Sequence, residues 1–316
     1  MLRVTLLGTG ATMPTPERAL AAMALSCQGR TILFDCGEGT QLQMRRHHVS
    51  AARVDFIALT HYHGDHIFGL PGLLQTIACL GRTEPLYFAG PEGLERAMAP
   101  IFALAGPMPF EIRGVTLGKN GADLSEFLPG WPRGSVLSAV GTAHRVSSQG
   151  YVFHLRRAGR FLPEQAEKLG VQKKDWGKLQ RGERVGRVKP SQVMGPERPG
   201  LTVAFSGDTK PCRTFEKAAR GADLLIHEAT YASEADRAEA NRWGHSTCAD
   251  AAEAAVRTGA KRLWLTHLSQ AIEDEAAALE TARAIFPAAE CPPDGHGIRL
   301  SFPEETTPTE GIYEIL

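Results

Sequence analysis

Short apolar segments alternate with polar or glycine-rich turns along most of this chain. Runs of about five apolar residues, a length typical of buried strands, lie at 2–8, 30–35, 56–60, 86–90, 140–144, 151–155, 201–205, 224–228 and 262–267. Helix-like apolar spacing lies between several of them, at 41–47, 69–80, 91–98 and 247–258. The pattern predicts strands alternating with helices, as in an α/β protein.

Several predicted strands end in a side chain that can bind a metal. The terminal residues are His61, His144, Asp208, His227 and His267. Sheets of α/β proteins build their sites at the carboxyl ends of strands, so these residues are candidates for one common site. Each of the later residues is weak evidence alone, and a lone histidine is more often structural than a ligand.

The strongest local signal is the run from His61 to His66, which holds three imidazoles and one carboxylate. His61 and His63 are two residues apart, so an extended segment points both rings the same way. Asp65 and His66 fall on the turn that follows. This spacing predicts two adjacent divalent cations, one on each pair. Imidazole and carboxylate favour zinc, with manganese and iron as alternatives. A polar loop without metal is the competing interpretation, but four such ligands in six residues are rare by chance.

Composition is that of a soluble globular protein, with 43% hydrophobic and 22% charged residues among 316. The sequence holds no apolar run of the roughly 20 residues that a membrane span needs. The first residues lead directly into a predicted strand without the apolar region of a signal peptide. The six cysteines are scattered and form no Cys-x-x-Cys pair. We therefore expect a reduced, cytoplasmic protein without a membrane partner.

Charge is distributed unevenly, although the formal net charge is zero. Residues 156–200 hold twelve Lys/Arg and five Asp/Glu, a net charge of +7, so the rest of the chain carries −7. We expect a single domain over 1–316 in which 156–200 forms a protruding basic arm with a short helix near 163–169. By itself such a segment is also typical of a solvated charged loop.

Motifs over most of the chain resemble the metallo-β-lactamase fold and, more narrowly, the ribonuclease Z family. Besides the run at 61–66, they lie at 8–10, 35–41, 69–74, 81–82, 90–91, 206–209 (Ser-Gly-Asp-Thr), 227–230 (His-Glu-Ala-Thr), 245–247 (His-Ser-Thr) and 265–269 (Leu-Thr-His-Leu-Ser). The resemblance implies an α/β fold of the αββα type, in which two mixed sheets are flanked by helices, with the basic segment as an inserted arm.

The resemblance also implies a complete site with two zinc ions per chain, or manganese in their place. One metal would be held by His61, His63 and His144, the other by Asp65, His66 and His267, with Asp208 and a hydroxide bridging them. Such a pair lowers the pKa of a shared water and neutralises a phosphodiester. Asp65 could relay the water's proton. His245, oriented by Glu228, is the candidate for stabilising the transition state or protonating the leaving oxygen; alternatively, it caps the helix that starts near 246–247.

The implied activity is that of an endoribonuclease that removes the 3′ trailer from precursor tRNA. Attack in line on phosphorus would expel a ribose 3′-oxygen and leave a 3′-hydroxyl on the tRNA. The basic segment corresponds to the family's arm, or exosite, which grips tRNA and serves the partner's site in a homodimer. The predicted substrate-binding residues are Arg18, Lys173, Lys174, Trp176, Lys178 and Arg181.

Three departures from the family pattern lie where RNA would be handled. Ala19 follows Arg18 where the family usually has Asn, Ala271-Ile272 replaces Arg-Tyr, and the arm lacks a Gly-Pro element at 171–177. They favour an alternative, a phosphodiesterase or arylsulfatase-like hydrolase of the same fold, which the arm disfavours. A β-lactamase is disfavoured because Asp208 stands where those enzymes with two metals commonly have Cys. A non-catalytic RNA-binding relative is disfavoured because all seven ligands are present.

Overall fold

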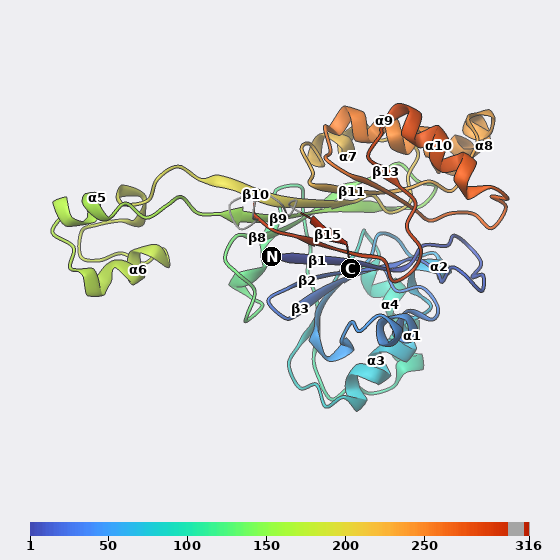
Figure 1. Ribbon diagram of the computed structural model, residues 1–316. Coiled ribbons are helices and arrows are strands. Elements are labelled where there is room, and N and C mark those ends of the chain that lie inside the picture. Colours follow the sequence, from blue (N-terminus) through green and yellow to red (C-terminus); the bar gives the residue numbers. More distant parts are fainter. Residues whose placement is uncertain (303–312, 316) are drawn as a thin grey trace. The chain divides into compact units, whose positions relative to one another are not determined.

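The structure is a computed structural model that describes residues 1–302 and 313–315 (Figure 1). The chain forms two compact units, one of Met1–His154 with Leu201–Leu316 and one of Leu155–Gly200. The second unit covers nearly the same residues as the arm expected at 156–200. No helix in the described part of the chain is long and apolar enough to cross a membrane.

The first unit contains a mixed sheet of eight strands among the described residues. The order is β15-β14-β1-β2-β3-β4-β5-β6. Antiparallel pairs join β15 to β14, β14 to β1, β1 to β2 and β2 to β3, whereas β3 to β6 pair in parallel. The bounds are β1 Leu2–Gly8, β2 Ala22–Cys27, β3 Arg30–Phe34, β4 Val54–Ala58, β5 Leu86–Ala89, β6 Ile112–Gly114, β14 Gly297–Leu300 and β15 Tyr313–Ile315.

A second mixed sheet has the order β13-β12-β11-β10-β9-β8-β7. Strands β10 to β13 pair in parallel, and β7 pairs antiparallel with β8. The bounds are β7 Ala122–Asp123, β8 Ser135–Gly141, β9 Gln149–Arg157, β10 Arg198–Phe205, β11 Leu224–Glu228, β12 Leu263–Thr266 and β13 Ala289–Glu290. The two sheets meet through aromatic rings: Phe34 of β3 lies 5.5 Å from Tyr151 and 5.9 Å from Phe205 between ring centroids.

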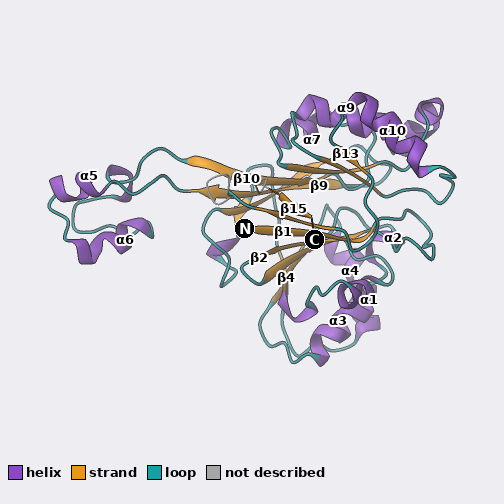
Figure 2. Cartoon of the chain, in the orientation of Figure 1, coloured by secondary structure: helices purple, strands orange, loops and turns teal. Residues whose placement is uncertain are grey.

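Helices lie outside the two sheets in the first unit (Figure 2). Beside the first sheet are α1 Thr40–Arg46, α2 Gly64–Ile67, α3 Leu70–Cys79 and α4 Leu94–Ala105, and beside the second are α7 Arg213–Ala218, α8 Arg237–Trp243, α9 Cys248–Thr258 and α10 Glu275–Ile285. Short 3-10 helices lie at Ala51–Arg53, Leu124–Glu126 and Glu234–Asp236. This arrangement confirms the predicted αββα sandwich with two mixed sheets.

Each helical layer buries its own apolar core against its sheet. Under α3, Leu73 and Leu74 pack with Ile57 of β4 in one cluster, and small Ala251 and Ala255 of α9 pack with Leu265 of β12 in the other. All six side chains are fully buried, and each large one contributes about 1.5–3 kcal/mol relative to exposure. The resulting rigid strands hold the loops at their carboxyl ends.

The second unit has a small core of its own. It contains α5 Pro163–Lys168, α6 Trp176–Gln180 and 3-10 helices at Lys173–Asp175 and Pro190–Gln192. Ala166, Val171, Leu179 and Val193 are buried together. The short helix expected near 163–169 is confirmed by α5. Because these residues form a packed core, the segment is not the solvated loop that charge alone would allow.

Candidate metal centre

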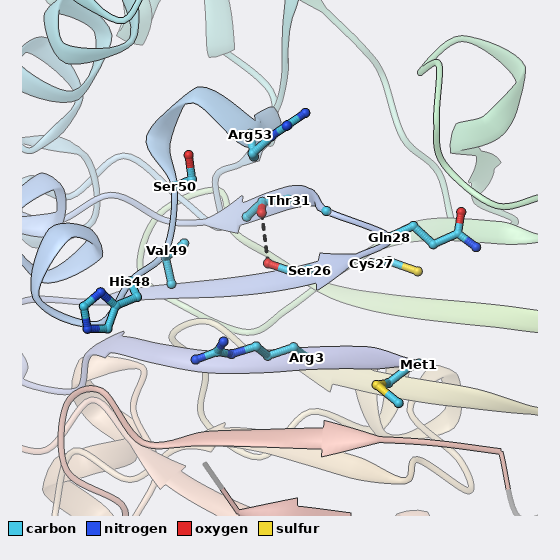
Figure 3. A pocket seen from close by; sticks show the side chains of 11 residues that line it. Met1, Arg3, Ser26, Cys27, Gln28, Thr31, His48, Val49, Ser50 and Arg53 are labelled. Atoms are coloured by element: carbon cyan, nitrogen blue, oxygen red, sulfur yellow. Dashed lines mark hydrogen bonds between the residues drawn. The ribbon is translucent and has the colours of Figure 1, made fainter. Parts of the chain in front are cut away.

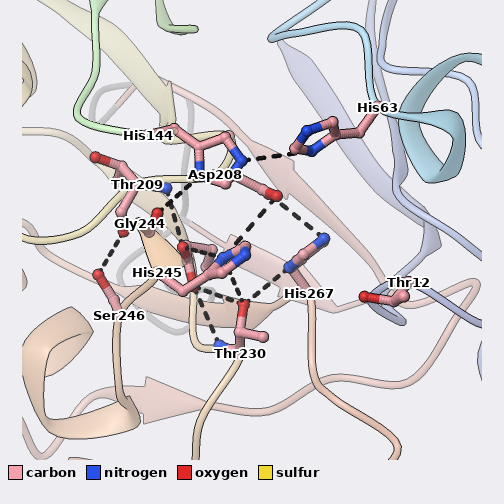
Figure 4. Close-up of polar contacts among 12 residues, drawn as sticks. Thr12, His63, His144, Asp208, Thr209, Thr230, Gly244, His245, Ser246 and His267 are labelled. Atoms are coloured by element: carbon pink, nitrogen blue, oxygen red, sulfur yellow. Dashed lines mark hydrogen bonds and ion pairs between the residues drawn. The ribbon is translucent and has the colours of Figure 1, made fainter. Parts of the chain in front are cut away.

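The side chains at the carboxyl ends of β4, β8, β10 and β12 come together in one site (Figure 4). His61 and His63 lie between β4 and α2, and Asp65 and His66 lie on α2 itself. His144, Asp208 and His267 follow β8, β10 and β12 in the loops beyond each strand. His227, also a strand end, is buried away from the group and its Nδ1 pairs with the Glu228 carbonyl. Four of the five strand ends singled out in the sequence therefore converge.

A first group of ligand atoms comes from His61, His63, His144 and Asp208. His63 Nδ1 lies 2.9 Å from His61 Nε2 and 3.4 Å from His144 Nε2. Asp208 Oδ2 lies 3.6 Å from His61 Nε2. Three ring nitrogens and one carboxylate oxygen thus face a common point.

A second group comes from Asp65, His66 and His267. Their closest atoms are His66 Nε2 and His267 Nε2, 3.2 Å apart, and Asp65 Oδ2 lies 3.4 Å from His267 Nε2. Asp208 Oδ1 lies 3.4 Å from both of these histidine nitrogens. Because Asp208 turns one oxygen to each group, it lies where a bridging carboxylate would.

The donor set fits divalent cations. Ligand nitrogens at about 2.0–2.1 Å from a tetrahedral zinc lie roughly 3.3 Å from one another, which is the spacing found in both groups. Asp208 Oδ1 is buried and accepts no hydrogen bond among the described residues. Burying a carboxylate oxygen without a hydrogen bond costs free energy unless a positive charge compensates it. Imidazole with carboxylate therefore forms a site for divalent metal ions here.

Hydrogen bonds behind the ligands fix the orientation of each ring. Asp35, at the end of β3, accepts from His66 Nδ1 at 2.8 Å and from Thr60 Oγ1 at 2.8 Å. Thr60 Oγ1 in turn lies 3.1 Å from His61 Nδ1. With their Nδ1 atoms engaged, His61 and His66 present Nε2 to the metal position, the arrangement usual around metal-binding histidines.

The remaining ligands are held by partners far away in the sequence. His144 Nδ1 donates to the carbonyl of Gly244 at 2.8 Å. His267 Nδ1 lies 2.9 Å from Thr230 Oγ1, which donates to Glu228 Oε2 at 2.8 Å. Asp65 Oδ2 accepts from the Thr12 amide at 2.8 Å. Burial opposes ionisation of Asp65, but the hydrogen bond of His267 outweighs it and lowers the pKa of that carboxyl.

His245 and Glu228 form a pair beside the metal ligands. His245 Nδ1 lies 2.9 Å from Glu228 Oε1, and the rings of His245 and His267 are stacked with centroids 5.6 Å apart. Burial by itself would lower the pKa of His245, but the Glu228 carboxylate raises it to about 9. The helix α9 is capped by Thr247, whose hydroxyl accepts from the Asp250 amide. The alternative that His245 caps this helix is therefore wrong.

Comparison with known proteins places the chain in a family. A profile of the Metallo-beta-lactamase superfamily matches residues 28–240. Ribonuclease Z of Agathobacter rectalis is 38% identical over 309 residues, which cover 96% of this chain and 100% of that protein. Ribonuclease Z of Gemmatimonas aurantiaca is 40% identical over 323 residues, covering 98% and 99%. This chain belongs to the ribonuclease Z family. The resemblance drawn from its motifs is confirmed.

A solved structure agrees with this family assignment. The crystal structure of human tRNase Z, short form, is similar with a TM-score of 0.66 at 28% sequence identity. The similarity covers 95% of this chain and 100% of the human chain. The fold described above is thus similar to that of human tRNase Z over nearly the full length of both chains.

Arg18, which the sequence predicted to bind substrate, is a buried residue. Its guanidinium bonds both oxygens of Glu275, at 2.7 and 2.6 Å, and also Thr9 Oγ1 and the Pro292 carbonyl. The residue is only 9% exposed. Glu275 begins α10, so this arginine ties the first loop to that helix. A structural role accounts for these contacts, and the substrate role stays a prediction.

The other predicted substrate-binding residues belong to the second unit. Lys178 pairs with Asp175 at 2.8 Å, and Arg181 pairs with Glu183 at 2.9 Å. Lys173 and Lys174 are exposed, whereas Trp176 packs on Phe161 and donates to the Val171 carbonyl. The indole is therefore part of the small core, and the substrate-binding role of Trp176 stays a prediction.

Sequence reasoning missed the residues that orient the ligands. Asp35, Thr60, Thr230 and the carbonyl of Gly244 had no assigned role. Asp35 carried a usable signal, because it ends the predicted strand at 30–35 in the same way that Asp208 ends its own. Threonine and a backbone carbonyl carry no such signal.

A separate cavity of about 600 Å³ lies along β1, β2 and β3 (Figure 3). It is lined by Met1, Arg3, Ser26, Cys27, Gln28, Gly29, Thr31, His48, Val49, Ser50 and Arg53. None of the candidate metal ligands is among them. This cavity is therefore distinct from the metal centre.

Proposed function

We propose that this chain is a zinc-dependent endoribonuclease that removes the 3′ trailer from precursor tRNA. The observation that carries the proposal is near full-length similarity to ribonuclease Z proteins together with a complete set of seven ligands in one site. Those relatives are named ribonuclease Z, and the similar human structure is that of a tRNase Z. The ligand set supports carrying it to this chain.

Two zinc ions per chain are the proposed cofactors. His61, His63 and His144 would hold one, and Asp65, His66 and His267 the other, with Asp208 between them. When bound, such a pair of cations activates a water and neutralises charge on a phosphodiester. The spacing of the donor atoms and the unpartnered oxygen of Asp208 support this assignment.

The chain's own residues would handle the protons of the reaction. Asp65 keeps an ionised carboxylate, with Oδ2 held by the Thr12 amide, and can accept the proton of the attacking water. His245 donates through Nδ1 to Glu228, which leaves Nε2 directed away from that pair and without a hydrogen-bond partner in residues 1–302. Through Nε2, His245 can donate to the ribose 3′-oxygen as it leaves, so that the tRNA ends in a 3′-hydroxyl.

Incubation of the purified protein with a precursor tRNA and zinc or manganese tests the proposal. We expect a single cut after the discriminator base, giving a 3′-hydroxyl on the tRNA and a 5′-phosphate on the trailer. Asp65→Ala should remove the cleavage, whereas Leu104→Ala, an exposed change on α4, should not. An intact precursor with either metal would refute the activity, and fewer than one metal ion per chain would refute the cofactor assignment.

A phosphodiesterase for small molecules is the second candidate, favoured by Ala19 and Ala271-Ile272. The two activities differ in their need for residues 156–200, which we propose to be the tRNA-binding exosite. Deleting that segment should abolish cleavage of tRNA while a chromogenic phosphodiester is still hydrolysed. Equal loss of both would indicate a folding defect, and tRNA cleavage that survives the deletion would refute the exosite.

A homodimer is also proposed, and light scattering of the purified protein tests it.

A further inference from the structure

Large apolar side chains are exposed on loops next to the metal centre. Phe68 is 65% exposed, Met13 50%, Val146 42% and Trp243 39%. Each lies within two residues of a metal ligand, of His245, or of Thr12, whose amide binds Asp65. Exposed apolar groups gathered beside a site commonly mark where a partner or substrate binds. Trp243 is the one whose surroundings are best defined.

Trp243 and Arg145 meet at the site although they are far apart in the sequence. The Arg145 guanidinium carbon lies 4.4 Å from the centroid of the Trp243 ring, and that of Arg242 lies 5.9 Å away. The indole Nε1 donates to Glu239 Oε1 at 2.6 Å, which fixes the edge of the ring. The indole is therefore oriented, with one face covered by a guanidinium.

Gly244 brings this pair against the ligands. Its carbonyl accepts from His144 Nδ1, and its φ of 81° is favourable for glycine alone. A Cβ at this position would lie 2.9 Å from His144 Nδ1 and 3.1 Å from the Arg145 amide. The segment from Trp243 to His245 can therefore lie directly on the segment that carries His144 and Arg145.

The Arg145 and Arg242 side chains are exposed. Among the described residues, no carboxylate forms an ion pair with either guanidinium, and the nearby Glu239 carboxylate accepts from the Trp243 indole instead. An aromatic face with free guanidinium groups is how proteins bind single-stranded nucleic acid without reading its sequence, by stacking on bases and contacting phosphates.

We propose that Trp243 and Arg145 bind the unpaired nucleotide that adjoins the scissile phosphate. The base stacks on the indole face that Arg145 covers in this structure, and the displaced guanidinium contacts a phosphate. This subsite rests on the proposed tRNA-processing activity. It names residues outside the metal ligands, outside the His245–Glu228 pair and outside residues 156–200.

The test combines Trp243→Ala with abasic precursor tRNAs. One abasic substrate lacks the base on the 5′ side of the scissile phosphate, and a second lacks the base on the 3′ side. With the intact substrate, Trp243→Ala should lower kcat/KM about 10-fold, mainly through KM, because stacking of one base has roughly that strength. With the base missing at the stacked position, wild type and Trp243→Ala should be equal. Trp243→Phe should restore most of the activity.

Two controls separate the possible failures. Leu104→Ala should match wild type on every substrate, because this leucine is exposed on α4. If wild type cleaves precursor tRNA and Trp243→Ala cleaves it equally well, the subsite is refuted while the activity stands. A defect of Trp243→Ala that persists with both abasic substrates would show a structural role and also refute the subsite. If wild type does not cleave, the proposed function itself fails.

Binding can be measured without cleavage. A single-stranded oligoadenylate should quench part of the indole fluorescence of wild type, and that part should be missing in Trp243→Phe. Arg145→Ala should weaken binding of the oligonucleotide and reduce its dependence on salt, since a phosphate contact is lost. Equal quenching in wild type and Trp243→Phe would contradict stacking on this residue.

Discussion

Asp35 orients His66 directly and His61 through Thr60, although it is not itself a candidate ligand. One of its oxygens, Oδ2, accepts from both His66 Nδ1 and Thr60 Oγ1, and the other accepts from the Thr60 amide at 2.7 Å. Asp35→Asn keeps the size and one carbonyl oxygen. The carboxamide keeps most bonds when its oxygen faces His66 and Thr60 Oγ1, which turns its NH₂ against the Thr60 amide N–H. A bond to a charged oxygen is worth about 1.5–3 kcal/mol and a neutral one about 0.5–1.5 kcal/mol, so losing one bond and weakening two should cost roughly 3–6 kcal/mol of unfolding free energy.

The expected effect on metal binding is distinct from the loss of stability. With a neutral acceptor in place of the carboxylate, His66 is held less firmly with Nε2 toward the metal position, and loss of such support typically weakens metal affinity about 10–100-fold. Competition with a chromogenic chelator measures this affinity in folded protein. Unfolding by urea with the chelator in excess measures stability without the contribution of metal binding.

Asp55 supplies a matched control in the same sheet. It is equally buried and holds Arg30 at 2.8 Å and the Trp131 indole at 3.2 Å, but it contacts no ligand. Asp55→Asn should therefore destabilise the protein by a few kcal/mol without changing metal affinity in the folded state. If Asp35→Asn binds metal as tightly as Asp55→Asn does, Asp35 supports the fold alone and the reasoning fails.

Two further predictions concern parts of the molecule away from the metals. Replacing Lys173 and Lys174 by Ser should weaken tRNA binding and reduce the slope of log affinity against log salt by roughly 1–2, whereas Lys119→Ser should not; an unchanged slope would contradict phosphate contacts there. Burial opposes the charge of Glu216, but Arg257 outweighs burial and holds the pKa of that carboxyl below its ordinary value. This pair therefore stabilises the protein by roughly 1–2 kcal/mol above the unfolded pKa, and the contribution is lost as pH falls through the folded pKa. The stability difference between wild type and Glu216→Gln, measured by urea unfolding, should shrink toward acid pH; a difference that does not change with pH would refute it.

The sequence predicted the part of the site that is local. His61, His63, Asp65 and His66 lie in one short run after an apolar strand, so their types and spacing carry the signal together. His144 and His267 are single residues at the ends of apolar segments. They became interpretable because parallel strands bring their carboxyl ends to one edge of a sheet. The same pattern also selected His227, which points elsewhere, so strand ends by themselves give candidates and not a site.

The rest of the structure depends on contacts that the sequence does not display. Strand β2 was missed, because its apolar residues at Ala22–Cys27 follow a loop rich in Gly and Pro and contain no functional residue. Arg18 was assigned to the substrate by its position in a motif, but Glu275, 257 residues away, holds its guanidinium. The pairs that orient the candidate ligands are also far apart in the sequence: Asp35 and Thr60 are 25 residues apart, and His144 and Gly244 are 100 apart.

Glu228 contributes to both the proposed metal binding and the proposed proton donation in this site. One oxygen, Oε2, accepts from the Thr230 hydroxyl, which lies against Nδ1 of the ligand His267, while the other accepts from His245. A single buried carboxylate thus orients a proposed metal ligand and the proposed proton donor at the same time. The two oxygens are not equivalent in function, because only one reaches His245. Thr230→Val removes the path to His267 and a 3.2 Å contact with His245 Nδ1, but it keeps the 2.9 Å bond between His245 and Glu228. It should therefore weaken metal affinity while largely preserving the pH dependence of cleavage at saturating metal. If this variant shifts the pH profile and leaves metal affinity unchanged, Glu228 does not divide its two roles between its oxygens.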